Sequence, residues 1–491
     1  MTLPLTPVWF VALPLLLAFA SPLWVRYRLL MPLLVGTPAL LLLLAFVLLP
    51  EVRTGPLLET IVIAPPLGIH LQLDSASWIL VALISLAGLL ATAFIWLSDA
   101  EPYLRDRRAF VFLLLLIAGC NGMVLTGDLF NLYVFLEIAG VSAYALSALR
   151  RDASALEAGL KYLIIGSVAA VFFLFSVVLI YLQTGQLNMA AVAARFGGIP
   201  APMQLLIGLL MLVGLGIKAE LFPFNFWVPD VYQGSHPVLA GLFSGLLVKA
   251  FLFVLFHLVF LLLADPQVAG LWLMGLGATT MLIAEVVALR QEDMRRMLAY
   301  SSLGQIGLIT LALGFGMQAT TAGGLFHMVN HTLVKLLLFL TAAVLLRSFV
   351  SARLADLAGA GRARPLAAAL FVLGALAVMG LPPLSGFASK LWILKGFAEA
   401  GVFWPVALIL LAALIEAGYY FRWIKVLYDP NGDLKAAAPV ERMAYVPMGV
   451  AAGLIILLGV APFLVDDLFI EGAQTLLDRG AALSAVLGAG S

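Results

Sequence analysis

Long apolar runs follow one another along almost the whole chain, separated by short polar stretches. A helix needs about 20 apolar residues to cross the hydrocarbon core of a bilayer. The pattern therefore predicts about fourteen membrane-spanning helices, several of which contain isolated polar positions. We expect these spans at residues 5–25, 29–50, 76–98, 109–127, 130–149, 161–183, 203–222, 238–264, 270–289, 298–316, 322–348, 365–398, 401–425 and 443–466.

Composition indicates an all-α polytopic membrane protein. Hydrophobic residues make up 64% of the 491 residues and charged residues 11%, a balance that no soluble core requires. The segments between spans are too short for independent domains, so we expect one membrane domain over residues 1–491. Ala18-Phe19-Ala20 resembles a signal-peptidase site, but no basic region precedes the first apolar run. We expect that span to be retained.

Arginine and lysine are distributed unequally between the two sets of loops. Arg53, Arg195 and Arg479 are the only basic residues outside the spans on one side, whereas the loops after spans 1, 3, 5, 9, 11 and 13 carry all the other basic residues outside the spans. Because cytoplasmic loops hold the positive excess, we expect both termini on the outer side of the cell (inner) membrane. Partner docking is the minor alternative for these basic stretches, and nothing in them indicates nucleic acid.

The sequence indicates no cofactor. Cys120 is the only cysteine, which excludes an internal disulfide, an iron–sulfur cluster and a cysteine-based zinc site. His327 and His331 are one helical turn apart beside a lysine, an arrangement better suited to proton transfer than to haem ligation. No phosphate-binding loop of the P-loop type is present. We expect a transport subunit, not an enzyme, with energy supplied by a gradient or a partner.

Ionisable side chains inside the predicted spans are the strongest functional signal. A charge near the centre of a bilayer costs a few kcal/mol or more, so several such residues in one chain indicate ion movement. Glu137 lies in an apolar stretch and can exchange a proton or pair with a lysine, although a purely structural ion pair is the alternative. The lysines of this set are Lys218, Lys249, Lys335 and Lys390.

Two histidines and a lysine recur at intervals of four residues in the eleventh span. His327, His331 and Lys335 should form a polar stripe about 12 Å long on one helix face. Lys249 and His257 repeat the eight-residue spacing in the eighth span. Alternating imidazole and amine groups, with water between them, make a plausible chain for proton transfer. Interhelical hydrogen bonding is the alternative reading.

Prolines predict breaks in spans 7 and 12. Pro223 follows Lys218, and Pro382-Pro383 precedes Lys390, and proline cannot continue a helical hydrogen-bond pattern. The recurrence suggests an internal repeat, with spans 4–8 in residues 109–264 and spans 9–13 in residues 270–425. Since each copy has an odd number of spans, the two copies should be inverted. Two unrelated proline kinks are the alternative.

Five short motifs carry a family resemblance over most of residues 70–425. The chain resembles the D subunits of the Mrp-type multisubunit sodium/proton antiporters, whose relatives include antiporter-like membrane subunits of respiratory complex I and membrane-bound hydrogenases. The motifs are Thr126–Asn131 leading to Glu137, Lys218 through Asp230, Leu298–Ser302, the stripe that begins at His327, and Leu381-Pro382-Pro383 with Lys390.

The resemblance implies fourteen helices and assigns a role to each buried ionisable residue. Glu137 and Lys218 would be the interacting pair of one half-channel, and Lys249 the connecting lysine. The other half-channel would use His327, His331 and Lys335 as its central relay and Lys390 as its terminal group.

The implied function is proton translocation in a monovalent cation (sodium)/proton antiporter, with other hydrophobic subunits as partners in the lipid bilayer. We expect the Glu137–Lys218 distance to control the proton, since an ion pair at 4 Å is worth about 4 kcal/mol at an effective dielectric of about 20. A proton-pumping subunit of a redox-driven complex is the main alternative, and a passive scaffold is another. No sodium site is identified: Asp128 and Glu416 are only guesses, and Glu416 could as easily form an interhelical pair.

Overall fold

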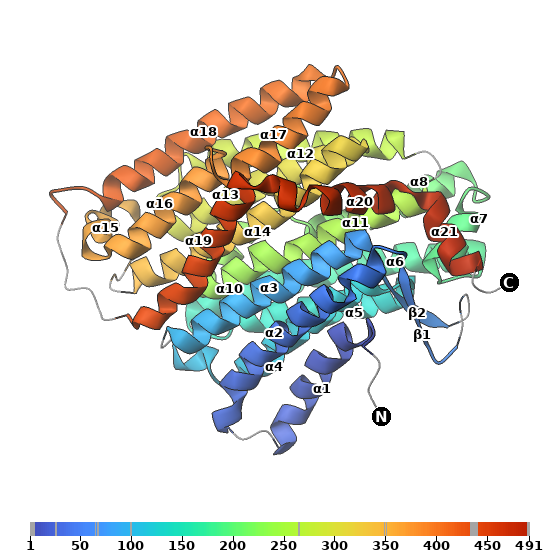
Figure 1. Ribbon diagram of the computed structural model, residues 1–491, viewed down its shortest axis with the longest axis horizontal. Coiled ribbons are helices and arrows are strands. Elements are labelled where there is room, and N and C mark those ends of the chain that lie inside the picture. The colour runs from blue at the N-terminus through green and yellow to red at the C-terminus, as the bar shows by residue number, and fades with distance from the viewer. Residues whose placement is uncertain are drawn as a thin grey trace.

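The structure, a computed structural model, describes residues 5–488 except 25–26, 64, 66–67, 99–100, 264–265, 348, 350 and 433–439. Arg26 and Lys435, which belong to the basic loops, therefore lie outside the described residues. Nearly every described element is a helix (Figure 1). The elements of the first half are α1 (Trp9–Trp24), α2 (Tyr27–Val52), β1 (Leu57–Ile61), β2 (Ile69–Leu73), α3 (Ser75–Leu97), η1 (Pro102–Leu104), α4 (Arg107–Leu125), α5 (Leu129–Ser147), α6 (Ala153–Thr184), α7 (Met189–Phe196), α8 (Ala201–Lys218), α9 (Val228–Gly234), α10 (Pro237–Leu242), the π-helical η2 (Phe243–Leu247) and α11 (Val248–Leu262).

The second half continues in the same manner and ends in helices that cross the bundle. Its elements are α12 (Gln267–Ala288), α13 (Met294–Gly314), α14 (Gln318–Leu346), η3 (Leu354–Leu357), α15 (Ala360–Ala363), α16 (Pro365–Met379), α17 (Ser385–Glu399), α18 (Phe403–Leu427), η4 (Arg442–Ala444), α19 (Tyr445–Val460), η5 (Pro462–Leu464), α20 (Asp466–Leu477) and α21 (Arg479–Leu487).

The expected polytopic helical fold is confirmed. Twelve helices in the described part of the chain are long and apolar enough to cross a membrane, or 13 if the bent pair Leu354–Ala363 and Pro365–Met379 counts as one span. Each expected apolar run coincides with a helix or with a pair of consecutive helices. The first expected span is a shorter apolar helix, Trp9–Ser21, and the twelfth is divided between α16 and α17.

One small element departs from the all-α expectation. β1 and β2 form an antiparallel hairpin in which Glu59 lies opposite Leu71 and Thr60 opposite His70. The β2 residues His70, Leu71 and Leu73 are buried, whereas most of β1 is exposed. From Leu57 to Thr60, β1 alternates between half-buried and exposed side chains, as a strand with one covered face does, whereas the adjacent His70 and Leu71 of β2 are both buried.

Both predicted helix breaks are present. α8 ends at Lys218, and the chain passes through turns before it resumes as α9 at Val228. α16 ends at Met379, and α17 begins at Ser385. Irregular backbone is tolerated at membrane depth only where protein or a wet cavity surrounds it. The two breaks are only partly enclosed, because Pro223, Phe226 and residues 381–383 are exposed, whereas Lys218 and Lys390, in the helices beside them, are buried.

The helices at the centre of the bundle are far more enclosed than those at its edge. In the most apolar 18-residue stretch of α13, 94% of the residues are buried, against 33% in α18. α14 runs through the middle of the molecule and packs against α10, α13, α16 and α17 (Figure 1). The red C-terminal helices cross this bundle, where α20 packs on α14 and α3, and α21 packs on α7. A charged side chain on α14 is therefore surrounded by protein.

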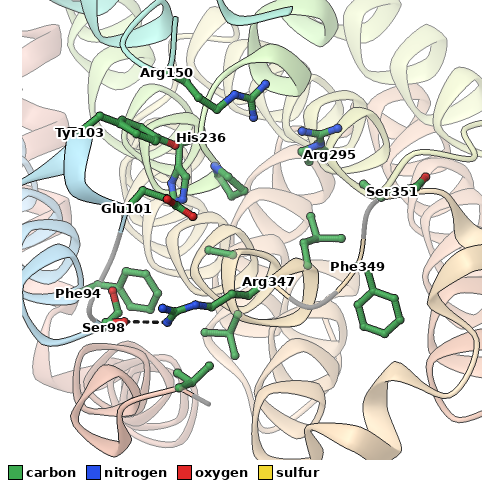
Figure 2. Close-up of a pocket in the computed structure, with 16 residues that line it drawn as sticks. Phe94, Ser98, Glu101, Tyr103, Arg150, His236, Arg295, Arg347, Phe349 and Ser351 are labelled. Carbon is green, nitrogen blue, oxygen red and sulfur yellow. Dashed lines mark hydrogen bonds between the residues drawn. The ribbon is translucent and has the colours of Figure 1, made fainter. Parts of the chain in front are cut away.

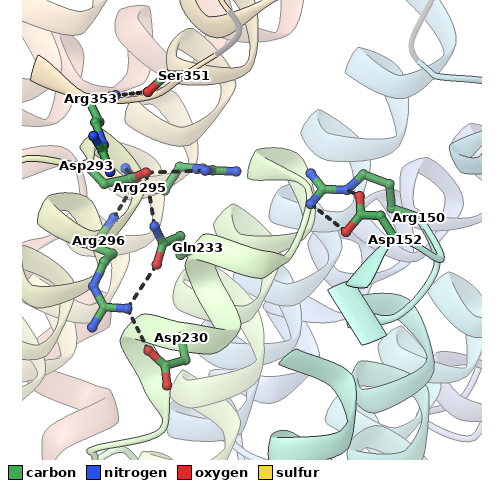
Figure 3. Close-up of polar contacts among 9 residues, drawn as sticks. All are labelled: Arg150, Asp152, Asp230, Gln233, Asp293, Arg295, Arg296, Ser351 and Arg353. Carbon is green, nitrogen blue, oxygen red and sulfur yellow. Dashed lines mark hydrogen bonds and ion pairs between the residues drawn. The ribbon is translucent and has the colours of Figure 1, made fainter. Parts of the chain in front are cut away.

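Polar side chains join α6, α9 and α13 at one end of the bundle. Asp230 of α9 accepts hydrogen bonds from Lys161 of α6 at 2.7 Å and from Arg296 of α13 at 2.6 Å, and Figure 3 shows the second of these. Arg296 also donates to Gln233, which in turn donates to Asp293. Burial raises the pKa of Asp230, but the bonds from Lys161 and Arg296 outweigh it and hold this pKa below its usual range. The cluster links the helix that follows the first break to the second half of the chain.

We predict that Asp230→Asn lowers the free energy of unfolding by about 1 kcal/mol, because these half-exposed ion pairs are screened by solvent. The stabilisation by Asp230 is present above the ordinary pKa of an aspartate and is lost as pH falls through the lowered pKa. Thermal unfolding in detergent should therefore show a smaller loss of stability in acid for Asp230→Asn than for the wild type.

Glu157→Gln is the matched control, since Glu157 pairs with the same Lys161 at an exposed position within one helix. It should change the unfolding temperature little. An equal loss of stability in both variants would contradict the role given to Asp230.

Candidate functional site

The first expected pair, Glu137 and Lys218, is formed. The Lys218 ammonium lies 3.5 Å from the Glu137 carboxylate and donates a shorter bond, 2.6 Å, to the Tyr144 hydroxyl. The Lys218 side chain is 1% exposed, whereas that of Glu137 is 28% exposed. Glu137 is thus only partly buried although it lies in an apolar stretch, and three other glutamates, Glu220, Glu285 and Glu416, are more deeply buried.

Two glycines make room for this pair. A β-carbon at Gly166 of α6 would lie 2.0 Å from the Tyr144 hydroxyl oxygen, and one at Gly140 would lie 3.0 Å from the Lys218 nitrogen. No side chain can occupy the first position without displacing Tyr144. The close approach of α5, α6 and α8 thus fixes the hydroxyl group that holds the lysine.

The second group of contacts lies at the centre of the bundle. The Lys249 ammonium contacts the His331 imidazole and donates to the backbone oxygen of Ser244 at 2.7 Å. Ser302 lies 3.4 Å from the other nitrogen of His331, and its hydroxyl contacts that of Ser244. Ser244 belongs to the π-helical turn η2, and such turns are frequent at functional sites. Span 8 and α14 are thus connected through Lys249 and His331.

The three ionisable residues of α14 are all buried, as the expected stripe requires, but they turn toward different helices. His331 faces Lys249, as described above. His327 contacts Gln305 of α13 and Ser389 of α17, each at 2.9 Å. Lys335 donates to Ser301 at 2.6 Å and lies 3.5 Å from the Tyr420 hydroxyl. The stripe therefore connects α11, α13, α17 and α18 and does not form a chain of direct bonds along one helix.

The last group of contacts ends in a second lysine–glutamate pair. Lys390 donates to Glu416 at 2.9 Å and to the backbone oxygen of Val378 at 2.7 Å, within the broken region of span 12. Both side chains are at most 8% exposed. Gln305 donates to Glu416 at 2.9 Å and contacts His327, so it joins the pair to α14. Glu416, for which the sequence left open a sodium ligand or an interhelical pair, is the partner of Lys390.

These contacts join polar side chains into four groups, which follow one another through the molecule and are buried except for Glu137. Together they include all seven residues expected from the sequence, and also residues that sequence reasoning missed. We use the name polar line for Glu137, Tyr144, Lys218, Ser244, Lys249, Ser302, His331, Lys335, Ser301, Tyr420, His327, Gln305, Ser389, Glu416 and Lys390.

Two missed residues could have been found by the criterion that selected Glu137. Glu285 lies inside the predicted span 270–289 and is fully buried beside Glu416 and Tyr419. Glu220 lies two residues after Lys218 and is also buried. Gln305, Tyr144 and the serines carry no such signal, because neutral polar residues are common in membrane helices. Asp128, the other guess for sodium, caps α5 by accepting from the Asn131 amide at 2.8 Å.

At one end of the bundle, three of the expected basic loops converge on a cavity of about 420 Å³. Arg150, Arg295 and Arg347 line it from the ends of spans 5, 9/10 and 11, and Arg347 donates to the Ser98 backbone oxygen at 3.0 Å (Figure 2). His236 caps α10 in the same cavity. Burial first, then Arg150 and Arg295, lower the pKa of His236 to about 3, so this imidazole is neutral. Loops expected on one side of the membrane are therefore at the same end of the molecule.

Comparison with known proteins supports one family. A family model described as "NADH:quinone oxidoreductase/Mrp antiporter, TM" matches residues 126–416. NADH-quinone oxidoreductase subunit N of Desulforudis audaxviator is 37% identical over 389 residues, which are 77% of this chain and 76% of that protein. The D subunit of the Na(+)/H(+) antiporter of Alkalihalophilus pseudofirmus is 31% identical over 431 residues, 86% of each chain.

Solved structures give the same result over almost the whole chain. A chain of the membrane-bound sulfane sulfur reductase, an archaeal respiratory membrane complex, superposes with a TM-score of 0.91 at 33% identity, covering 98% of this chain and 100% of that one. A chain of the Mrp complex from Dietzia sp. DQ12-45-1b gives 0.90 at 26% identity, with coverage of 99% and 100%. The expected superfamily is confirmed, and its Mrp branch is not favoured over subunit N. This chain belongs to the family of transmembrane subunits shared by NADH:quinone oxidoreductases and Mrp antiporters.

Proposed function

We propose that this chain is a proton-translocating subunit of a multisubunit membrane complex and that protons move along the polar line. The observation that carries the proposal is the run of contacts from Lys249 through His331, and from His327 through Gln305 to Glu416 and Lys390. Only one turn of α14 separates its two parts. Burying so many protonatable groups costs free energy. Proton exchange gives a reason for that cost, whereas a passive scaffold gives none.

The Glu137–Lys218 pair is the proposed control point of the first half. An ion pair at 4 Å is worth about 4 kcal/mol at an effective dielectric of about 20, and Glu137, being partly exposed, has room to move away. When the carboxylate is near, Lys218 holds its proton. When it withdraws, the Tyr144 hydroxyl is the one remaining acceptor of the ammonium among the described residues, and the proton moves on through Lys249.

The host complex has two candidates. Similarity to the D subunit of an Na(+)/H(+) antiporter and to a chain of an Mrp complex supports a cation/proton antiporter, with sodium as the exchanged cation and small hydrophobic subunits as partners. Similarity to subunit N of NADH-quinone oxidoreductase and to a chain of a respiratory reductase supports a redox-driven proton pump equally well. In either complex the chain is a transport subunit, and the reactions that supply energy belong to other subunits.

Two expectations about the chain's organisation are part of this proposal. The convergence of basic loops around Arg150, Arg295 and Arg347 supports a cytoplasmic location for that end and outward-facing termini. The matching helix breaks, each with a buried lysine paired to a glutamate, support two inverted repeats over residues 109–264 and 270–425.

We predict that Lys218→Ala and Glu137→Ala abolish proton transport without loss of assembly, because each removes one partner of the control pair. Transport should be measured in sealed vesicles that contain the assembled complex. Lys395→Ala and Glu399→Ala are matched controls, since these two residues form an exposed pair at 3.6 Å on α17. Wild-type transport by either well-expressed Lys218 or Glu137 variant would rule out the proposed pathway.

The host is identified by purifying the tagged chain from its native membrane in mild detergent. The co-purifying subunits are then determined by mass spectrometry, and flavin, iron and nickel are assayed. Several small hydrophobic subunits without redox cofactors would identify the antiporter. Stoichiometric iron–sulfur proteins would identify the redox-driven pump, and recovery of the chain alone would contradict a multisubunit complex.

A further inference from the structure

Glu220 occupies an unusual backbone position at the first helix break. Its φ angle is +63°, and the next amide, that of Leu221, donates to the Gly216 oxygen at 2.9 Å. This pattern is the common helix ending in which the residue after the cap is left-handed and is usually glycine. A residue with a side chain is disfavoured in this conformation. Glutamate at position 220 therefore makes this backbone conformation less stable than glycine would.

The second break of the same chain has the usual residue. Gly380 has a φ angle of +85°, and the Leu381 amide donates to the Leu376 oxygen at 3.0 Å, with the same spacing as at the first break. Glycine is thus sufficient for the backbone conformation of such a break. The side chain of Glu220 is not required for the turn, which indicates another role for it.

The Glu220 side chain is directed into the protein. The residue is 2% exposed, and one carboxylate oxygen accepts from the Tyr232 hydroxyl of α9 at 2.8 Å. The other oxygen, Oε2, is buried without a hydrogen-bond partner among the described residues. A half-satisfied buried carboxylate destabilises a fold, so Glu220 is a poor structural residue.

The ionisable groups that face Glu220 connect it with the centre of the polar line. They are Tyr232 of α9, Tyr162 of α6 and Lys249 of α11. The Tyr232 hydroxyl has Ser244 as its next polar neighbour, and Ser244 is the residue whose backbone oxygen accepts from Lys249. Along the chain, Glu220 is two residues after Lys218, at the end of α8.

We propose that Glu220 is a further proton-carrying residue that joins Lys218 to Lys249, an inference that rests on the proposed function. The Lys218 ammonium loses a proton and becomes an amine, and the proton binds Oε2 of Glu220 to give a carboxylic acid. Glu220 then returns to the carboxylate as the proton passes to the Lys249 amine, which becomes an ammonium. One proton moves and the total charge is unchanged.

The test compares Glu220→Gln, Glu220→Gly and Glu220→Asp in the complete complex. The complexes are reconstituted in liposomes with a pH-sensitive dye inside, and proton flux and melting temperature are both measured. Gln keeps the shape without the proton, Gly removes the backbone cost, and Asp keeps a carboxyl group on a residue that tolerates the left-handed region. Glu399→Gln, on the exposed end of α17, is the control.

We expect Glu220→Gln and Glu220→Gly to lower proton flux by at least about tenfold, the lower end of what one acid–base group contributes. Glu220→Asp should retain more flux than either, and Glu220→Gly should melt at the same or a higher temperature than the wild type. A residue needed only for structure would give the reverse, with Glu220→Gly unstable and Glu220→Gln fully active.

Wild-type flux in Glu220→Gln, or in Glu220→Gly if the Gln variant does not assemble, overturns this inference alone. A wild-type complex that moves no protons overturns the proposed function together with it.

Discussion

A lysine ammonium group enclosed by apolar helices is stable only if nearby acceptors compensate its charge, and the structure is organised around four such groups. The two outer lysines, Lys218 and Lys390, are each paired with a glutamate. Lys249 and Lys335, between them, hydrogen-bond only neutral groups in the described part of the chain. Under the proposed function, the strong charge compensation at the ends would hold a proton there, and the weaker compensation in the centre would let it pass.

Irregular backbone supplies part of that compensation. The Val378 oxygen that accepts from Lys390 is exposed by the break between α16 and α17, and the Ser244 oxygen that accepts from Lys249 belongs to a π-helical turn. A regular helix keeps its carbonyl groups bonded within itself, so an interruption leaves oxygens whose bonding capacity is available to a side chain. The prolines and the glycine that interrupt the helices therefore help to stabilise the same lysine ammonium groups as the polar side chains do.

The sequence predicted the parts of this arrangement that depend on one segment at a time. The length of the apolar runs predicted the spans, and the prolines predicted the breaks near Pro223 and Pro382. Charged residues isolated within apolar runs indicated the four lysines and Glu137. It did not predict that Gln305 joins His327 to Glu416, because that link depends on how α13, α14 and α18 pack. The exposure of Glu137 and the β hairpin likewise follow from the arrangement of neighbouring elements.

The most direct test of the account is proton flux through the reconstituted complex carrying Lys249→Met, which keeps the length of the central side chain and removes its protonatable amine. The account predicts that the complex assembles and that flux falls to the level of protein-free liposomes, while Lys395→Met, at a site 70% exposed, transports like the wild type. Undiminished flux through Lys249→Met would mean that protons do not cross the molecule along the polar line.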